Sequence, residues 1–407
     1  MTASTFHRLT TLSNLRSTWD KYWPLVRHQR TAGVDGITPL KFRRNSERYL
    51  ELIYRDLRSG YSFLDLRGHP IPKTDGKSYR MICVPTVRDR IVQRVFTKHL
   101  TEKADALGII NEVSFGFIPT IGGRKRGVQA ARDRALDLRR THRWAYKSDI
   151  SSFFDRIPRA PLIDQTISTL RTRSVREVLL QAASCEIAET DGMVARVLKE
   201  SKIERGVGVR QGMPLSPVFS NIILRDFDRE MVKRGANMVR YVDDFIVLAD
   251  TEGECREIDK IARDILAKKK FELPSLDEES KTYIANPDEE IEFLGLAVAP
   301  AEGGSYQLVL TTRQIEKVKC EINKLKDVSW LVAEGIDITK LTRTIESRIG
   351  GYMAAYKDAQ NIEELRIILE QCRTGILRSI FAKAFGEQNV RSLTPSMKKF
   401  FQLEPVP

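Results

Sequence analysis

One nine-residue stretch near the middle of the chain limits what this sequence can fold into. Residues 240–248 read RYVDDFIVL, in which two adjacent carboxylates, Asp243 and Asp244, interrupt an apolar, β-prone run. This pattern predicts a strand, a tight turn and a second strand. Like charges repel each other, so the two aspartates need either open contact with water or a cation that neutralises them. Taken alone, the stretch favours a solvated turn.

A second predicted strand contributes a third carboxylate. Residues 144–150, WAYKSDI, alternate as a half-buried strand does and carry Asp149 at the strand end. A strand end and a hairpin turn can converge at one edge of a sheet. Mg²⁺ binds such hard oxygen ligands, and two ions about 3.5–4 Å apart stabilise the attacking and the leaving oxygen of a phosphoryl transfer. An ordinary acid at a strand end is the alternative for Asp149.

The composition favours a globular protein with a polyanionic partner. The 407 residues carry a formal net charge of +13, and Lys or Arg side chains placed on phosphates release condensed counterions. The five cysteines are scattered without a CxxC pair, which argues against a zinc knuckle or a disulfide framework. There is no run of 18 apolar residues and no signal-peptide pattern, so we expect no membrane association and a cytoplasmic location.

The hydrophobic spacing along the chain predicts the α+β class. Helical spacing dominates residues 1–60, residues 86–107 and the chain after about residue 311. Short extended segments are expected at 68–85 and 281–298. The three aspartates would therefore lie on a small sheet, with helices around it and an all-α tail.

The neighbours of the aspartates resemble a known family. YVDD between β-rich flanks, with DISSFFDRI before it and RQGMPLSPVFSNI between, is similar to the palm of reverse transcriptases, in particular the bacterial lineage related to group II introns. The resemblance runs in family order over roughly residues 30–360. Its further blocks are AGVDGIT (32–38), IPKTDGKSYRMICVPTVRDRIVQ (71–93), VSFGFIPTIGGRKRGVQAA (113–131), KTYI (281–284), FLGL (293–296) and IESRIGGYMAAYKDA (345–359).

The resemblance implies a right-hand polymerase: fingers, a palm with an antiparallel β-sheet, and an all-α thumb. We expect N-terminal helices and fingers over residues 1–140 and a palm over 141–305, which includes part of a helical insert at 158–205. A helical thumb and C-terminal tail would occupy residues 306–407.

The resemblance to reverse transcriptases also implies which residues bind the metal ions. Asp149 and Asp243 would bridge two Mg²⁺ ions, with Mn²⁺ as an alternative, and Asp244 would support the site or bind more weakly. Ile150, next to Asp149, would add its backbone carbonyl. Tyr241 would pack under the primer terminus, unless it is an ordinary core tyrosine.

The nucleotide site follows from the same resemblance. Phe154 falls where the family places a bulky side chain that excludes a 2′-hydroxyl, although one of Phe153 and Phe154 is expected to be core. Gln211 would contact the incoming nucleotide, and Gly212 would let backbone approach the template–nucleotide pair. The cations expected at the phosphates are Lys73 (with Lys77 as an alternative), Arg80 and Lys281, the last of which is otherwise an ordinary surface lysine. The expected primer grip is Phe293, Leu294 and Gly295.

These residues predict a nucleotidyltransferase of the RNA-directed DNA polymerase type. It would add dNTPs to a DNA or RNA primer on an RNA template, and the basic stretch Arg124–Arg126 would hold nucleic acid. The closest class is the free-standing "unknown group" or abortive-infection-like reverse transcriptases, which predicts antiphage defence and allows a dedicated noncoding RNA or a partner protein. The alternatives are a retron-type or CRISPR-associated reverse transcriptase, an RNA-dependent RNA polymerase, and an inactive nucleic-acid-binding scaffold.

Overall fold

The computed structural model describes residues 3–73, 78–118, 120, 123, 125–188, 192–277 and 280–403. It has two compact units. One contains Met1–Leu138 and His142–Ile284, and the other contains Arg139–Thr141 and Ala285–Pro407. Within the described ranges, no helix combines the length and the apolar character that crossing a membrane requires.

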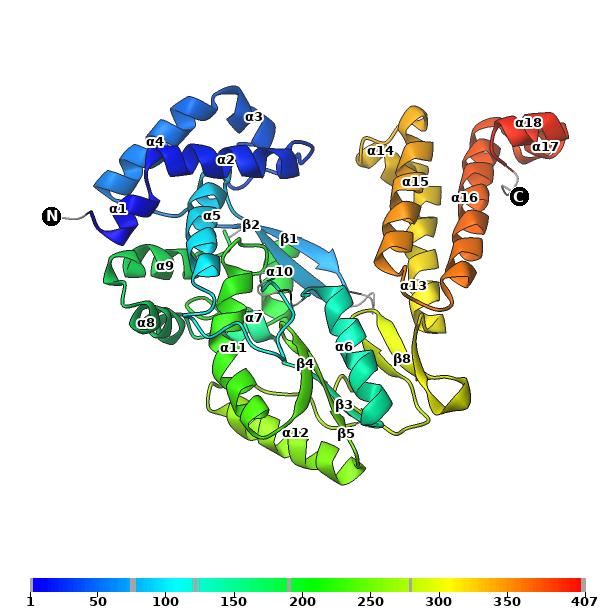
Figure 1. Ribbon diagram of the computed structural model, residues 1–407. Helices are drawn as coiled ribbons and strands as arrows, with labels where there is room; N and C mark the ends of the chain where they lie inside the picture. Colours follow the sequence, from blue (N-terminus) through cyan, green and yellow to red (C-terminus); the bar gives the residue numbers. More distant parts are fainter. Residues whose placement is uncertain are drawn as a thin grey trace. The chain divides into compact units, whose positions relative to one another are not determined.

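The first unit begins with four helices, as the periodicity of residues 1–60 predicts. They are α1 (Thr5–Leu9), α2 (Leu12–Val26), α3 (Pro39–Arg44) and α4 (Ser46–Ser59) (Figure 1). Threonine side chains cap α2 and α3, because Thr11 accepts from the Asn14 N–H and Thr38 from the Lys41 N–H. Trp19 is buried against Phe42, with ring centroids 4.6 Å apart.

A two-stranded antiparallel sheet and two helices follow. β1 (Arg67–Pro72) pairs with β2 (Tyr79–Val84), and α5 (Val87–Glu102) starts directly after Thr86, whose side chain caps it. α6 (Val128–Thr141) leads into the central sheet. The prediction of extended segments at 68–85 is thereby confirmed, and the helix predicted at 86–107 is present but ends at Glu102.

The central sheet holds the aspartates. Its strand order is β4-β5-β3-β6, with β3 (Trp144–Asp149), β4 (Asn237–Tyr241), β5 (Asp244–Ala249) and β6 (Tyr283–Ala285). β5 pairs antiparallel with both β3 and β4. One face packs on α11 (Ser216–Lys233) and α12 (Glu252–Ala267) (Figure 1). There Phe245 contacts Phe227, and the hydroxyl of Tyr146 donates to Asp259.

Helices fill the segment between β3 and α11. They are α7 (Phe153–Arg156), α8 (Arg159–Leu170), η1 (Arg173–Val175), α9 (Arg176–Ala183) and α10 (Met193–Glu200). After β5, α12 ends at Ala267 and the chain then turns through Lys270, whose φ is +63°. The extended region at 281–298 contains β6, β7 and the start of β8.

The second unit combines a small sheet with helices. β7 (Ile291–Phe293), β8 (Leu296–Pro300) and β9 (Tyr306–Val309) form an antiparallel sheet, and η2 (Glu302–Gly304) lies between the last two strands. The helices are α13 (Thr312–Asn323), η3 (Lys324–Lys326), α14 (Val328–Ala333), α15 (Ile338–Ala355), α16 (Ile362–Phe385), α17 (Glu387–Arg391) and α18 (Pro395–Phe400). α13, α15 and α16 pack on one another (Figure 1), which confirms the all-α tail.

Candidate active site

The hairpin β4–β5 presents the aspartates at its turn. Val242 and Asp243 are the two turn residues, and Tyr241 pairs with Asp244 across the turn. In turn, Asp244 pairs with Asp149 at the end of β3. Directly opposed residues share a face of the sheet, so Tyr241, Asp244 and Asp149 form a row. The Asp243 carbonyl accepts from the Ile150 N–H at 3.2 Å, which ties the turn to the end of β3.

A buried ion pair holds this hairpin in place. Arg240 and Asp228 of α11 are 0% and 1% exposed, and the guanidinium donates to both carboxylate oxygens at 2.6 and 2.5 Å. Arg240 also donates to the Val242 carbonyl at 2.8 Å, inside the turn itself, and to the hydroxyl of Ser114 at 2.9 Å. Bidentate pairs of this kind fix orientation as well as charge. Arg240 therefore positions the aspartate turn.

The neighbouring carboxylates disfavour the ionisation of Asp243 and Asp244. Burial raises the pKa of Asp243 to about 7, and the negative charges of Asp149 and Asp244 add to the effect. Burial likewise raises the pKa of Asp244 to about 6, and Lys147 only partly opposes it. The Oδ1 atom of Asp244 is buried without a hydrogen-bond partner, and the Lys147 ammonium lies 3.8 Å from it. Lys147 alone therefore supplies too little positive charge for the three carboxylates.

Lys281 supplies part of that charge. Its ammonium donates to Asp149 Oδ2 at 2.5 Å, although the lysine side chain is 71% exposed. Among the residues that the structure describes, no three His, Cys, Asp or Glu side chains form a ready-made metal site. The donor set nonetheless fits a hard divalent cation. It consists of carboxylate oxygens, one of them buried and unpartnered, and Asp149 already attracts a cation.

The two phenylalanines after β3 separate as expected. Phe153 is buried and packs on Phe271, with ring centroids 5.2 Å apart, so it is the core residue of the two. Phe154 is half-buried, and its carbonyl accepts from the Val209 N–H at 2.7 Å. The structure thus leaves part of the Phe154 ring accessible, in the segment that follows Asp149. Its role as a sugar-sensing residue remains a prediction.

The QG segment packs on β2. The Gln211 carbonyl accepts from the Cys83 N–H at 2.8 Å. Gly212 has a φ of +101°, and a Cβ there would lie 2.4 Å from the Cys83 carbonyl oxygen. The close backbone approach that the structure shows at Gly212 is therefore to β2. Its expected approach to a template–nucleotide pair stays a prediction.

Gly212→Ala is expected to cost more stability than Gly36→Ala. Both glycines have a positive φ, but a Cβ at Gly36 meets nothing within 4 Å. We expect Gly36→Ala to lower the free energy of unfolding by about 1–2 kcal/mol, the cost of a left-handed conformation. Gly212→Ala should lose a further 1–3 kcal/mol or so through overpacking. Urea denaturation compares the two, and equal losses would contradict the packing of Gly212 on β2.

Two of the expected phosphate-binding cations, Lys73 and Arg80, belong to the β1–β2 hairpin. Lys73 and Arg80 are both exposed, and the Lys73 N–H donates to the Ser78 carbonyl at 2.7 Å. Burial raises the pKa of Asp155, while Arg210 and Lys73 oppose that rise, which places the Lys73 charge near the segment that carries Phe154. Lys77 and Arg124 lie outside the described residues.

The expected primer-grip residues belong to the second unit. Phe293 is the buried last residue of β7. Leu294 and Gly295 are the two turn residues between β7 and β8, with φ values of +52° and +86°. Two consecutive positive φ values are typical of a type I′ hairpin turn. Binding of a primer by this turn remains a prediction.

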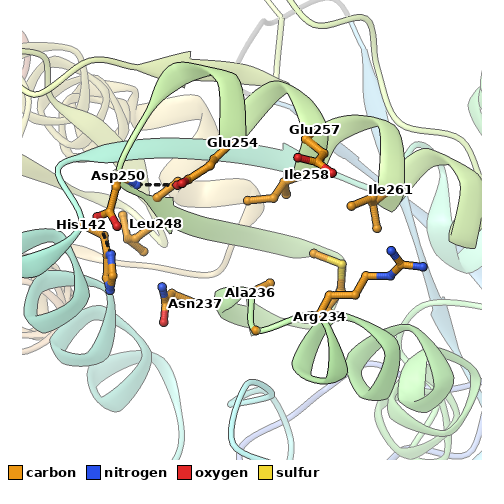
Figure 2. A pocket seen from close by; sticks show the side chains of 13 residues that line it. His142, Arg234, Ala236, Asn237, Leu248, Asp250, Glu254, Glu257, Ile258 and Ile261 are labelled. Carbon is orange, nitrogen blue, oxygen red and sulfur yellow. Dashed lines mark hydrogen bonds and ion pairs between the residues drawn. The ribbon is translucent and has the colours of Figure 1, made fainter.

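A hollow of about 490 Å³ lies at the other end of the β4–β5 hairpin (Figure 2). Asn237 and Leu248, which pair at that end, line it together with His142 and Asp250. The His142 Nδ1 atom lies 2.7 Å from Asp250 Oδ1. Since the aspartate turn is at the opposite end of the same strands, this hollow is separate from the candidate active site.

Comparison with known proteins identifies the class. Residues 71–298, more than half of the chain, match the family described as reverse transcriptase (RNA-dependent DNA polymerase). The chain belongs to this family. Membership confirms the right-hand polymerase class and the enzyme class, a nucleotidyltransferase of the RNA-directed DNA polymerase type. Reverse transcriptases work with divalent metal ions, which agrees with the donor set.

The individual proteins that resemble this chain share less than a third of the aligned residues with it. Protein YkfC of Escherichia coli (strain K12) is 29% identical over 206 residues, which cover 50% of this chain and 51% of that protein. The chain thus spans about half the length of this relative. Among solved structures, a partial Cas6-RT-Cas1–Cas2 complex is 21% identical, with 66% of this chain and 42% of that chain covered and a TM-score of 0.38. Apo telomerase from Candida tropicalis, truncated from the C-terminal domain, is 16% identical, with 65% and 59% covered and a TM-score of 0.39.

Proposed function

We propose that this chain extends a DNA or RNA primer on an RNA template with dNTPs. The observation that carries the proposal is the row of carboxylates at the ends of β3 and β5. The Asp243 turn is tied to Ile150 at 3.2 Å, and the negative charges of its neighbours help to raise the pKa of Asp243 to about 7. Three neighbouring carboxylates that Lys147 and Lys281 neutralise only in part suit chemistry in which metal ions and phosphates meet.

The ligands for the metal would be Asp149 and Asp243, with the Ile150 carbonyl and, more weakly, Asp244. Two Mg²⁺ ions, or Mn²⁺ in their place, would neutralise the charge that develops on the phosphates. Arg80 and Lys73 would orient the triphosphate, as a bidentate fork and a point charge respectively. Lys281, which now pairs with Asp149, would be available to the departing pyrophosphate. Gln211 would contact the incoming nucleotide.

Phe154 would select the sugar. The accessible part of its ring would occupy the space that a 2′-hydroxyl needs, so Phe154→Val is expected to raise the kcat/KM for rNTPs relative to dNTPs by about tenfold or more, which corresponds to about 1.4 kcal/mol. Single-nucleotide incorporation on one RNA template measures both substrates. Phe153→Leu is the control, because the buried Phe153 would affect stability and not sugar choice. An unchanged ratio in Phe154→Val would contradict the assignment.

Primer extension on an RNA template tests the proposed activity. The wild type should incorporate dNTPs and discriminate against rNTPs. A preference for rNTPs would indicate an RNA-dependent RNA polymerase. Extension that survives Asp149→Ala would contradict the assignment of the site, and a wild type that binds RNA but never extends a primer would indicate a scaffold.

For the biological role, we propose antiphage DNA synthesis by a reverse transcriptase of the group II intron-like lineage, of the "unknown group" or abortive-infection-like type. The intact RQGMPLSP block at residues 210–217 supports that lineage. The partners would be an RNA template, a primer and either a dedicated noncoding RNA or a partner protein. A plaque assay with wild type and Asp243→Asn in a phage-challenged host tests the role. Equal protection by both proteins would contradict an antiphage role of the polymerase activity. Sequencing of the co-purifying nucleic acid would reveal a retron-type or CRISPR-associated role instead.

A further inference from the structure

Phe117 is a large apolar side chain with two unfavourable properties. Its φ is +55°, in the left-handed region, and its side chain is 52% exposed. A bulky residue rarely adopts that region, because the Cβ approaches the following carbonyl oxygen. Such conformations persist where the surrounding structure imposes them, and they cluster at ligand-binding and active sites. Packing alone therefore does not explain the positive φ and the exposed ring of Phe117.

The backbone just before this ring is fastened to the YVDD hairpin. The Phe115 N–H donates to the Arg240 carbonyl at 2.8 Å, and the amide of Asn221 donates to the Gly116 carbonyl at 2.8 Å. A Cβ on Gly116 would lie 3.0 Å from the backbone nitrogen of Val242, so a larger residue there would push the segment away from the hairpin. The position of the ring is thus set by the same elements that set the aspartate turn.

The Phe117 ring extends the row of side chains that contains the carboxylates. Its centroid lies 5.9 Å from that of Tyr241, with the ring planes at 48°. Tyr241 is paired with Asp244, and Asp244 is paired with Asp149. Two aromatic rings, one of them half-exposed, consequently border the site at the edge strand β4.

We propose that Phe117 adds an aromatic face beside Tyr241, the tyrosine expected under the primer terminus, so that the two rings form a platform on which a nucleobase of the primer–template stacks. The proposal rests on the proposed function, because the duplex that the carboxylates extend would bring the base to the platform. Every base has a π-face, so stacking on aromatic side chains tolerates any sequence. Phe117 would act as a positioning residue that holds the duplex beside the carboxylates.

Phe117→Gly separates this role from a structural one. Glycine adopts a positive φ without strain, so the melting temperature should stay level or rise. The Kd for a fluorescent primer–template, measured by anisotropy without dNTPs, should increase by about tenfold, a typical loss for one base–aromatic stack. The increase should be similar for templates of different sequence. Phe117→Tyr keeps the ring, so it should bind like the wild type.

A second variant covers the case in which Phe117→Gly loses stability. Phe117→Leu keeps an apolar side chain of similar reach without an aromatic face, so it should still bind the primer–template more weakly than wild type. If either Phe117→Leu or a stable Phe117→Gly binds the duplex as tightly as wild type while the wild type extends primers, the platform is wrong and the proposed function stands. A wild type that neither binds nor extends the duplex overturns both.

Discussion

Replacement of Asp243 by Asn should abolish primer extension and leave the fold intact. The change removes the carboxylate of the turn next to Asp244 and Asp149, with almost no change in side-chain volume. The loss of one preorganised charge at a reaction centre typically costs about 10²–10³-fold in kcat, and the loss of a metal ligand should cost at least as much. Single-turnover extension of an RNA-templated primer measures the effect.

The same substitution should make the metal-free protein more stable at high pH. The folded-state pKa of Asp243 is raised by burial to about 7, above the unfolded value of about 3.9. A raised folded pKa means that the ionised form is disfavoured in the folded state, so stability falls as the pH rises from about 4 through about 7. In EDTA at pH 8, Asp243→Asn should therefore melt above the wild type, and the difference should vanish near pH 4.

Asp250→Asn is the matched control for both measurements. Asp250 follows the far end of β5, is 63% exposed and pairs with His142, so its substitution should leave primer extension unchanged. The two predictions are independent. Full activity in Asp243→Asn would overturn the assignment of the site, whereas lost activity with a lowered melting temperature at every pH would mean that Asp243 matters for folding.

The second large effect concerns stability. Arg240→Met should lower the free energy of unfolding by about 3–5 kcal/mol, because it leaves the carboxylate of Asp228 buried without its partner. The hydrogen bond to the Val242 carbonyl, 2.8 Å in the structure, would be lost as well. Urea denaturation followed by circular dichroism measures the change.

An exposed pair at the end of α11 serves as the comparison. Arg234 and Glu230 are 49% and 36% exposed, with a contact of 3.1 Å, and such pairs contribute about 0–1 kcal/mol. Arg234→Met should thus change the free energy of unfolding by less than about 1 kcal/mol. If Arg240→Met were equally mild, the hairpin would not depend on the buried pair.

Local patterns predicted the parts of the site that neighbours in sequence determine. The apolar, β-prone run of RYVDDFIVL and the alternation of WAYKSDI predicted the strands, and they allowed Asp149 and the Asp243 turn to converge at one edge of a sheet. The pair of phenylalanines was also sorted correctly into one core and one accessible ring. The strands follow from patterns that the sequence displays, whereas the choice between the two phenylalanines came from the family resemblance.

Long-range partners were not predictable in the same way. Arg240 is the first residue of RYVDDFIVL, but its partners lie on α11 and around Ser114, 126 residues away in sequence. Nothing near it in sequence therefore shows that it holds the aspartate turn in place. The positive φ of Phe117 could not be predicted from the sequence either, because it follows from the attachment of Gly116 to the hairpin. Gly212 was expected to need close backbone approach, but only the fold shows that β2 is what it approaches.

Crystals of the protein with an RNA–DNA primer–template, a non-hydrolysable dNTP and Mn²⁺ test the central claim most directly. Anomalous difference density should show two ions about 3.5–4 Å apart, both within bonding distance of the carboxylates of Asp149 and Asp243, with Lys281 released from Asp149. A correctly bound primer end and nucleotide without ions at these two aspartates would contradict the account.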